Sequence, residues 1–223
     1  MTALATVQEI IDRYTDVRER IEAAAQHDQR VEVVAVTKTF PTELARRAVE
    51  AGLTNLGENY AQDLAAKAAD LASISPEAAS KVNWHFIGGL QRNKVKMLGD
   101  TVAVWQTVDR LSLVNELAKR VPGATIFIQV NTTEEDQKSG CHPSEAADLV
   151  DGARTVGLDV RGLMTIGPTD GSIPVAAFEH LRRLAKDLGL DELSMGMSGD
   201  YETAVRCGAT TVRIGSALFG RRR

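Results

Sequence analysis

The sequence predicts a single domain over residues 1–223, folded as a (β/α)8 TIM-type barrel with an extra N-terminal helix. Three observations predict this fold class. Short apolar, β-branched segments recur eight times, amphipathic segments of helical period separate them, and no linker interrupts the alternation. Apolar strands alternating with helices form a parallel sheet, and eight such units close into a barrel. The alternative is an open doubly wound sheet, which is disfavoured because no Gly-rich dinucleotide motif follows the first strand.

The elements follow from the period of the apolar residues. Ala5–Ala25 contains no Gly or Pro and repeats at helical spacing, which predicts the leading helix. Val31–Thr37 is mostly apolar and β-branched, which predicts a buried strand that ends at Lys38, and Pro41 begins the next helix, to about Ala51. Further strands are predicted at Thr54–Leu56, Val82–Ile87, Val102–Thr107, Ala124–Val130, Gly162–Ile166, Leu193–Met197 and Thr210–Ile214. Helices are predicted between them at Ala61–Ala72, Asn93–Leu98, Leu111–Arg120, Ser144–Val156, Pro174–Leu188 and Asp200–Cys207.

Composition narrows the function classes. The net charge of −4 argues against nucleic-acid binding, and Arg221–Arg223, the only tight basic run, is interpreted as a solvated tail. Cys141 and Cys207 are too few and too far apart for a disulfide framework, which suggests free thiols in the cytoplasm. We find no signal peptide, membrane span or metal-ligand spacing. The loop Thr169–Pro174 is predicted to be flexible.

Polar residues follow the predicted strands, where a barrel places its functional groups. We expect all of them to face one mouth. They are Lys38, Glu58, Asn59, His85, Gln106, Asn131, Met164 with Thr165, Ser198 with Gly199, and Arg213 with Gly215 and Ser216.

The loops after strands seven and eight predict a phosphate site. Barrels often bind phosphate there, and both loops carry small residues that allow backbone N–H groups to approach an anion. Ser198 and Ser216 can each add a hydroxyl donor near Gly199 and Gly215. Either loop alone could be only a helix cap or a turn. The two together, correctly placed in the strand order, favour phosphate.

Lys38 and Arg213 suggest what the phosphate belongs to. Lys38 follows a buried strand, where partial desolvation makes the neutral amine accessible for a Schiff base with an aldehyde. The ligand is then a phosphorylated aldehyde, either pyridoxal 5′-phosphate (PLP) or a sugar phosphate. PLP enzymes pair the pyridine nitrogen with Asp or Arg, so Arg213 favours PLP. An always-protonated Arg would keep that nitrogen unprotonated, which makes the cofactor a weaker electron sink. Alternatively, Arg213 only pairs with Glu58 or Asp200.

The motifs together closely resemble the YggS/PROSC family, the PLP homeostasis proteins. The resemblance spans essentially the whole chain, in order. It rests on Ala35-Val36-Thr37-Lys38, Gly57-Glu58-Asn59-Tyr60, Trp84-His85-Phe86-Ile87-Gly88, Leu90-Gln91-Arg92-Asn93-Lys94, Gly162-Leu163-Met164-Thr165-Ile166-Gly167, Leu193-Ser194-Met195-Gly196-Met197-Ser198 and Val212-Arg213-Ile214-Gly215.

The resemblance implies a barrel like the N-terminal domain of bacterial alanine racemase, with PLP carried by Lys38. It also implies that Ser198, Gly215 and Ser216 hold the phosphate and that Arg213 faces the pyridine nitrogen. Asn59 and Met164 are implied to line the ring pocket.

The chain departs from the family pattern at two glycines. Gly89 stands where a His is expected, and Gly199 where a second Ser is common. The first departure leaves any role of that His in doubt. The second removes one hydroxyl donor from the phosphate loop but keeps a backbone N–H group.

Two main functions are then compared. One is a non-catalytic PLP carrier, with PLP-dependent apoenzymes as possible recipients. The other is an amino-acid racemase, which needs an acid/base group on each face of the substrate carbon. The racemases take the second group from an added domain that this sequence lacks. Tyr14, Tyr60, Tyr201 and His85 are weak substitutes, so we favour a carrier, and a monomer. A cofactor-free sugar-phosphate aldolase or isomerase is a third hypothesis.

Overall fold

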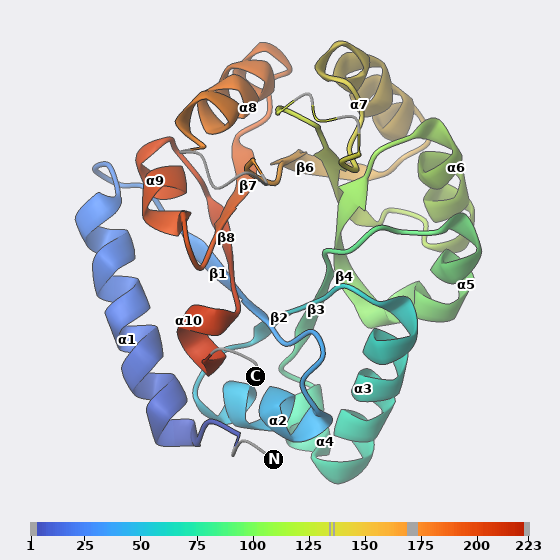
Figure 1. Cartoon of the computed structure of the whole chain (residues 1–223). Helices are drawn as coiled ribbons and strands as arrows, with labels where there is room; N and C mark the ends of the chain where they lie inside the picture. The colour runs from blue at the N-terminus through green and yellow to red at the C-terminus, as the bar shows by residue number, and fades with distance from the viewer. Residues whose placement is uncertain (1–3, 134, 136, 169–173, 221–223) are drawn as a thin grey trace.

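The computed structural model contains eight parallel strands that close into one barrel in chain order, with β1 pairing with β8 (Figure 1). This confirms the predicted fold class. The structure describes residues 4–133, 135, 137–168 and 174–220. The predicted flexible loop, apart from Pro174, and the basic tail Arg221–Arg223 lie outside these residues. The strands are β1 (Glu32–Val36), β2 (Asn55–Glu58), β3 (Asn83–Phe86), β4 (Val102–Val108), β5 (Thr125–Gln129), β6 (Asp159–Met164), β7 (Glu192–Met197) and β8 (Thr211–Ile214).

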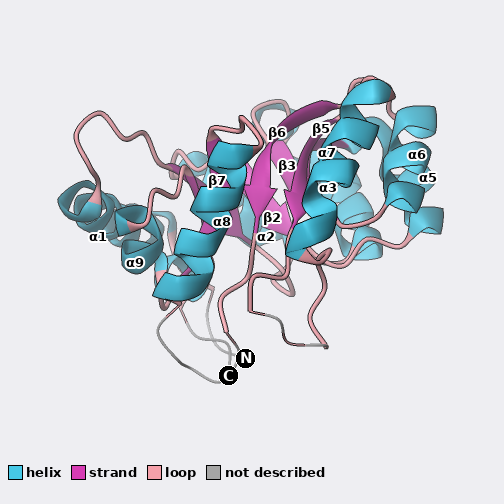
Figure 2. Cartoon of the chain, turned by 90° about the horizontal axis from the view of Figure 1, so that it is seen from above, coloured by secondary structure: helices cyan, strands magenta, loops and turns pink. Residues whose placement is uncertain are grey.

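Helices surround the barrel, as the view at right angles shows (Figure 2). The α-helices are α1 (Val7–Ala24), α2 (Thr42–Glu50), α3 (Ala61–Ile74), α4 (Pro76–Ala79), α5 (Val95–Leu98), α6 (Leu111–Arg120), α7 (Ala146–Thr155), α8 (Val175–Asp187), α9 (Tyr201–Arg206) and α10 (Ser216–Phe219). Short 3-10 turns occupy Arg92–Lys94, Gly99–Thr101 and Pro143–Glu145. None of the described helices is both long enough and apolar enough to cross a membrane.

The leading helix α1 packs on the outside of the barrel against α9 and α10 (Figure 1). It begins after Thr6, whose hydroxyl accepts from the Glu9 amide at 3.2 Å while the Glu9 carboxylate accepts from the Thr6 amide at 2.7 Å. This capping box satisfies two backbone donors that the first turn cannot pair. Ile10, Val17 and Ile21 form its buried face, so the sequence folds this segment as an amphipathic helix.

Most element bounds lie within two residues of the predicted ones, but some elements differ by more. Strand β6 begins at Asp159, not Gly162, because Asp159 pairs with Thr125 of β5 although its side chain is exposed. The predicted helix Asn93–Leu98 is a 3-10 turn followed by one turn of α-helix, α5. The short helices α4 and α10 were not predicted, because four residues are too few to show a helical period. These differences leave the order of the barrel unchanged.

Candidate functional site

A cavity of about 280 Å³ opens at the C-terminal ends of the strands, where the sequence predicted the site. Seven of the eight predicted binding residues line it. Its lining comprises Val36, Lys38, Phe40, Asn59, Ile87, Ile166, Met197, Ser198, Gly199, Arg213, Gly215, Ser216 and Gly220. Met164 is fully buried at the end of β6, and Ile166, two residues further on, lines the cavity instead. Residues from six strand ends, those of β1, β2, β3, β6, β7 and β8, therefore converge on one space.

Lys38 occupies a tight turn that follows β1. The Phe40 amide donates to the Thr37 carbonyl at 3.1 Å, and Thr39 has a φ of 64°, in the left-handed region. A positive φ at the third residue of a four-residue turn is the pattern of a type II turn. It is uncommon for a β-branched residue, so the surrounding structure must hold this turn in place. Lys38 is the second residue of the turn and is partly exposed into the cavity.

The loops after β7 and β8 meet at the Ser198 hydroxyl. Its oxygen accepts from the Gly215 amide at 3.1 Å and from the Ala217 amide at 3.2 Å. The Asp200 carboxylate holds the first loop by accepting from the Met197 amide at 2.6 Å. Two backbone N–H groups that converge on one oxygen also suit an oxygen of an anion. The predicted phosphate loops therefore lie together, on the wall of the cavity that also carries Gly199 and Ser216.

Arg213 brings a buried positive charge to the cavity. Its guanidinium donates to the Ser194 hydroxyl at 2.7 Å and to the Thr165 carbonyl at 2.8 Å. Burial lowers the pKa of Arg213 to about 10, an effect that the charge of Asp200 opposes, so the group remains cationic at neutral pH. The alternative that Arg213 pairs with Glu58 is wrong, since Glu58 forms its ion pair with Lys67.

Behind Arg213, a chain of buried hydrogen bonds crosses the barrel interior. The Ser194 hydroxyl donates to the Gln106 carbonyl oxygen at 2.6 Å, and the Gln106 amide contacts Nδ1 of His85 at 2.9 Å. With the amide as donor, His85 is neutral and carries its proton on Nε2. Burial lowers the pKa of His85 to about 4, which agrees with a neutral ring.

We expected every polar residue at a strand end to face the mouth, but some of them do not. Glu58, His85 and Gln106 are each at most 3% exposed and line neither the main cavity nor its neighbour. Side chains alternate between the two faces of a strand, so a position at a strand end does not by itself decide which way a side chain points.

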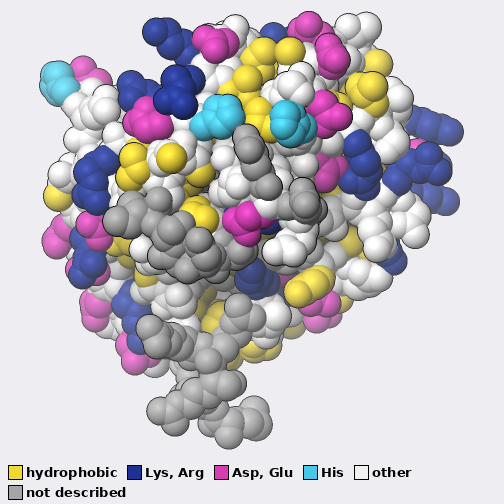
Figure 3. Space-filling view, turned by 45° about the horizontal axis from the view of Figure 1, so that its top comes forward, with side chains coloured by type: hydrophobic (Ala, Val, Ile, Leu, Met, Phe, Trp, Pro, Cys, Tyr) yellow, Lys and Arg dark blue, Asp and Glu magenta, His cyan; other side chains and the backbone are white. Residues whose placement is uncertain are grey.

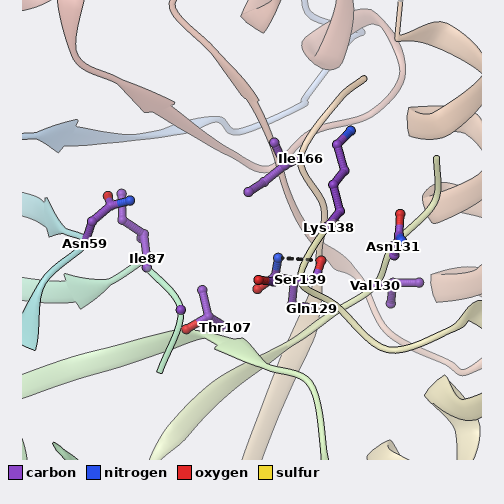
Figure 4. Close-up of a pocket in the computed structure, with 11 residues that line it drawn as sticks. Asn59, Ile87, Thr107, Gln129, Val130, Asn131, Lys138, Ser139 and Ile166 are labelled. Atoms are coloured by element: carbon purple, nitrogen blue, oxygen red, sulfur yellow. Dashed lines mark hydrogen bonds between the residues drawn. The ribbon is translucent and has the colours of Figure 1, made fainter. Parts of the chain in front are cut away.

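A second, smaller cavity of about 120 Å³ adjoins the first. The two share Asn59, Ile87 and Ile166 in their linings. Figure 4 shows Asn59 and Thr107 across from Gln129, whose amide donates to the Ser139 carbonyl at 3.0 Å. The side-chain oxygens of Asn59 and Thr107 are buried without a hydrogen-bond partner among the described residues. The floor of the joint cavity thus offers polar atoms to a ligand.

Gly88 and Gly89, two adjacent glycines that line the smaller cavity, are expected to respond differently to substitution. A Cβ at Gly88 would lie 2.0 Å from the carbonyl oxygen of Asn59, whereas a Cβ at Gly89 meets nothing within 4 Å. We expect Gly88→Ala to lower the free energy of unfolding by about 2 kcal/mol, because backbone must move, and to weaken ligand binding through Asn59. Gly89→Ala, the matched control, should change both by little. Chemical denaturation and a ligand titration of the two variants test this, and equal stabilities would contradict it.

Several residues of the site were not predicted from the sequence. Phe40, Ile87, Met197 and Gly220 line the main cavity, but apolar and small residues at strand ends resemble ordinary core residues. Ser194 did leave a signal, a hydroxyl residue in the middle of an apolar strand. The described residues that line the main cavity include no His, Tyr, Asp, Glu or Cys. Tyr60 is 55% exposed and lies in a different surface pocket.

The fold and the site define a (β/α)8-barrel protein that brings a lysine, a buried arginine and an anion-type loop pair to one mouth. The family model described as "Alanine racemase, N-terminal domain" matches residues 13–223. A protein of Pseudomonas aeruginosa named pyridoxal phosphate homeostasis protein is 41% identical over 215 residues, which cover 92% of this chain and 91% of that protein. The chain therefore belongs to the alanine racemase N-terminal domain family and, within it, to the pyridoxal phosphate homeostasis proteins.

Solved structures agree with this assignment. PipY of Synechococcus elongatus, whose structure was determined with PLP bound, superposes with a TM-score of 0.81 at 29% identity, covering 95% of this chain and all of that one. A protein of unknown function from Bifidobacterium adolescentis superposes with a TM-score of 0.85 at 32% identity, covering 96% and 95% of the two chains.

Proposed function

We propose that this protein binds PLP as a Schiff base on Lys38 and serves intracellular PLP homeostasis as a carrier rather than as an enzyme. The observation that carries the proposal is the single cavity that brings together Lys38, Arg213 and the paired loops of Ser198 and Gly215. The names of the relatives and the PLP-bound structure of PipY support the choice of ligand.

The residues present fit PLP. The Gly215 and Ala217 amides converge on the Ser198 hydroxyl oxygen, an arrangement that also suits an oxygen of a phosphate, and Ser216 adds a hydroxyl beside them. The Arg213 guanidinium would face the pyridine nitrogen. The unpartnered side-chain oxygen of Asn59 lies in the same cavity and would accept a hydrogen bond from the ligand. When bound, PLP supplies an aldehyde for a Schiff base and an electron sink, which a cationic arginine at the ring nitrogen weakens.

The described lining favours the carrier. Lys38 can take or give a proton on one face of a bound amino acid, but racemisation needs a second acid/base group on the other face. The described lining supplies no such second side chain, and His85, the buried candidate, is held by Gln106 outside the cavity. The racemase alternative rests on the family model and on the fold that this chain shares with an alanine racemase.

We expect Lys38→Ala to abolish the absorbance band of the Schiff base completely. An alanine has no amine to attack the aldehyde, although the phosphate contacts would remain. The spectra of the purified variant and of wild type incubated with PLP provide the measurement. Lys81→Ala, an exposed lysine paired with Glu77, is the control and should keep the band. A Lys38→Ala protein with an unchanged band would contradict the proposal, and a wild type that cannot be loaded would favour the sugar-phosphate hypothesis.

Loaded wild type incubated with single-enantiomer amino acids separates a carrier from a racemase. We expect the chirality of the amino acid to persist. Robust turnover of the amino acid would contradict the carrier hypothesis.

Other parts of the proposal concern the setting of the protein. We propose a cytoplasmic, monomeric carrier, with residues 1–223 as one PLP-binding domain and PLP-dependent apoenzymes as recipients. The net charge of −4 supports a partner other than nucleic acid, and on the face in Figure 3 Lys and Arg side chains lie among Asp and Glu over much of the surface drawn in colour. Two buried free thiols, Cys141 and Cys207, suit a reducing compartment.

A further inference from the structure

A buried ion pair lies directly behind the turn that carries Lys38. Lys67 of α3 pairs with Glu58 at the end of β2, and their side chains are 6% and 0% exposed. The Lys67 ammonium also donates to the Thr37 carbonyl at 2.8 Å, and the Thr37 hydroxyl donates to the same Glu58 oxygen at 2.7 Å. Neither charged residue lines the cavity.

Every polar atom of Thr37 is held by these neighbours. Its amide donates to the Gly57 carbonyl at 3.0 Å, its hydroxyl reaches Glu58, and its carbonyl accepts from both Lys67 and Phe40. Thr37 is fully buried. The residue immediately before Lys38 is therefore fixed by β2 and α3, across sequence separations of about twenty and thirty residues.

The turn needs such support because of its backbone. Thr39 adopts a φ of 64°, which is unfavourable for a β-branched residue and persists only where the surroundings over-determine it. The ammonium of Lys67 shares the Thr37 carbonyl with the Phe40 amide that closes the turn. The hydrogen bond from Lys67 therefore holds Thr37, the first residue of the turn, and the hydrogen bond from the Phe40 amide holds the last residue.

The ion pair of Lys67 and Glu58 is linked to two residues that line the cavity. Glu58 precedes Asn59, and Thr37 precedes Lys38, so one ion pair joins the two strand ends that deliver both side chains. The second oxygen of Glu58 is buried without a partner among the described residues. A buried, incompletely satisfied ion pair is a poor source of stability, and its position suggests a different purpose.

From these contacts we propose that Lys67 and Glu58 are positioning residues: they fix the Thr37–Phe40 turn so that the amine of Lys38 points into the cavity in the geometry that Schiff-base formation requires. The inference rests on the proposed function for the role of Lys38. The alternative is that the pair only anchors α3 to the barrel.

The double variant Glu58→Gln/Lys67→Met tests the proposal. It removes both charges together, and the glutamine keeps an acceptor for the Thr37 hydroxyl. Leu71→Ala is the matched control, because Leu71 is fully buried one turn further along the same helix and the substitution weakens the packing of α3 without touching Thr37. Two readouts are needed, namely hydrogen exchange of the Phe40 amide in the ligand-free protein and the rate at which Schiff-base absorbance develops after mixing with PLP.

We expect the double variant to exchange the Phe40 amide faster and to form the Schiff base about 10- to 100-fold more slowly, since a reacting group displaced by about 1 Å loses rate on that order. Leu71→Ala should leave both readouts near wild type even if it lowers the melting temperature as much. A double variant within twofold of wild type in both readouts would overturn the inference, and so would equal slowing in Leu71→Ala.

The outcome is distinguishable from a failure of the proposed function. If Lys38→Ala kept the Schiff-base band, the role of Lys38 would fail. The exchange of the Phe40 amide would still decide whether the ion pair holds the turn.

Discussion

Lys67→Met alone should lower the free energy of unfolding by about 3–5 kcal/mol, the effect expected when one member of a buried ion pair is removed. Lys67 and Glu58 have side chains 6% and 0% exposed, so the carboxylate left behind would have neither water nor a cation to stabilise it. Its second oxygen is already buried without a partner among the described residues. Urea denaturation of the ligand-free protein measures the change.

Two comparisons show whether the uncompensated charge is the cause. Glu58→Gln/Lys67→Met should recover most of the lost stability, because a neutral amide and a thioether cost far less to bury. Lys81→Met removes a lysine from an exposed ion pair with Glu77, and it should change stability by less than about 0.5 kcal/mol. A Lys67→Met protein about as stable as Lys81→Met would show that the buried pair contributes no charge compensation.

Periodicity was sufficient for the barrel because the strands are buried on both faces and the helices on one. Val31–Thr37 shows this, since a mostly apolar, β-branched run of that length next to amphipathic segments has few other solutions. Polar strands gave weaker signals. Asp159 begins β6 although its exposed carboxylate is typical of a loop, because pairing with β5 overrides the local preference.

The site was predictable where its residues follow strands directly. Lys38, Ser198, Arg213 and Gly215 converge because a parallel barrel brings all carboxyl ends of its strands to one mouth.

What could not be read from the sequence is the direction in which a strand-end side chain points. Glu58 was expected at the mouth but turns toward α3, where it meets Lys67 nine residues later. Lysine on a helix is usually solvated, so nothing local marks Lys67 as buried. The Ser194–Gln106–His85 chain joins three separate strands, and only the closed barrel brings these residues together.

His85, the buried histidine of this chain of hydrogen bonds, is expected to make the folded protein less stable at acid pH. Burial lowers the pKa of His85 from 6.5 to about 4, so the unfolded chain binds a proton at this site over a pH range in which the folded protein does not. Stability therefore falls as the pH falls from about 6.5 to about 4. Each pH unit removes up to about 1.4 kcal/mol, and the whole interval about 3 kcal/mol. Below about pH 4 the folded protein also takes up the proton, and this contribution levels off.

The variant His85→Gln isolates this contribution, because a glutamine oxygen can still accept from the Gln106 amide but does not titrate. We expect the free energy of unfolding of wild type, measured by urea denaturation at several pH values, to fall by about 3 kcal/mol more than that of the variant between pH 6.5 and 4. His27 is 97% exposed at its side chain, so His27→Gln serves as the control and should keep the wild-type slope. Parallel curves for wild type and His85→Gln would mean that His85 takes up its proton in the folded barrel. Protonated Nδ1 could then no longer accept from Gln106, and the chain of hydrogen bonds that ends at Arg213 would have to rearrange.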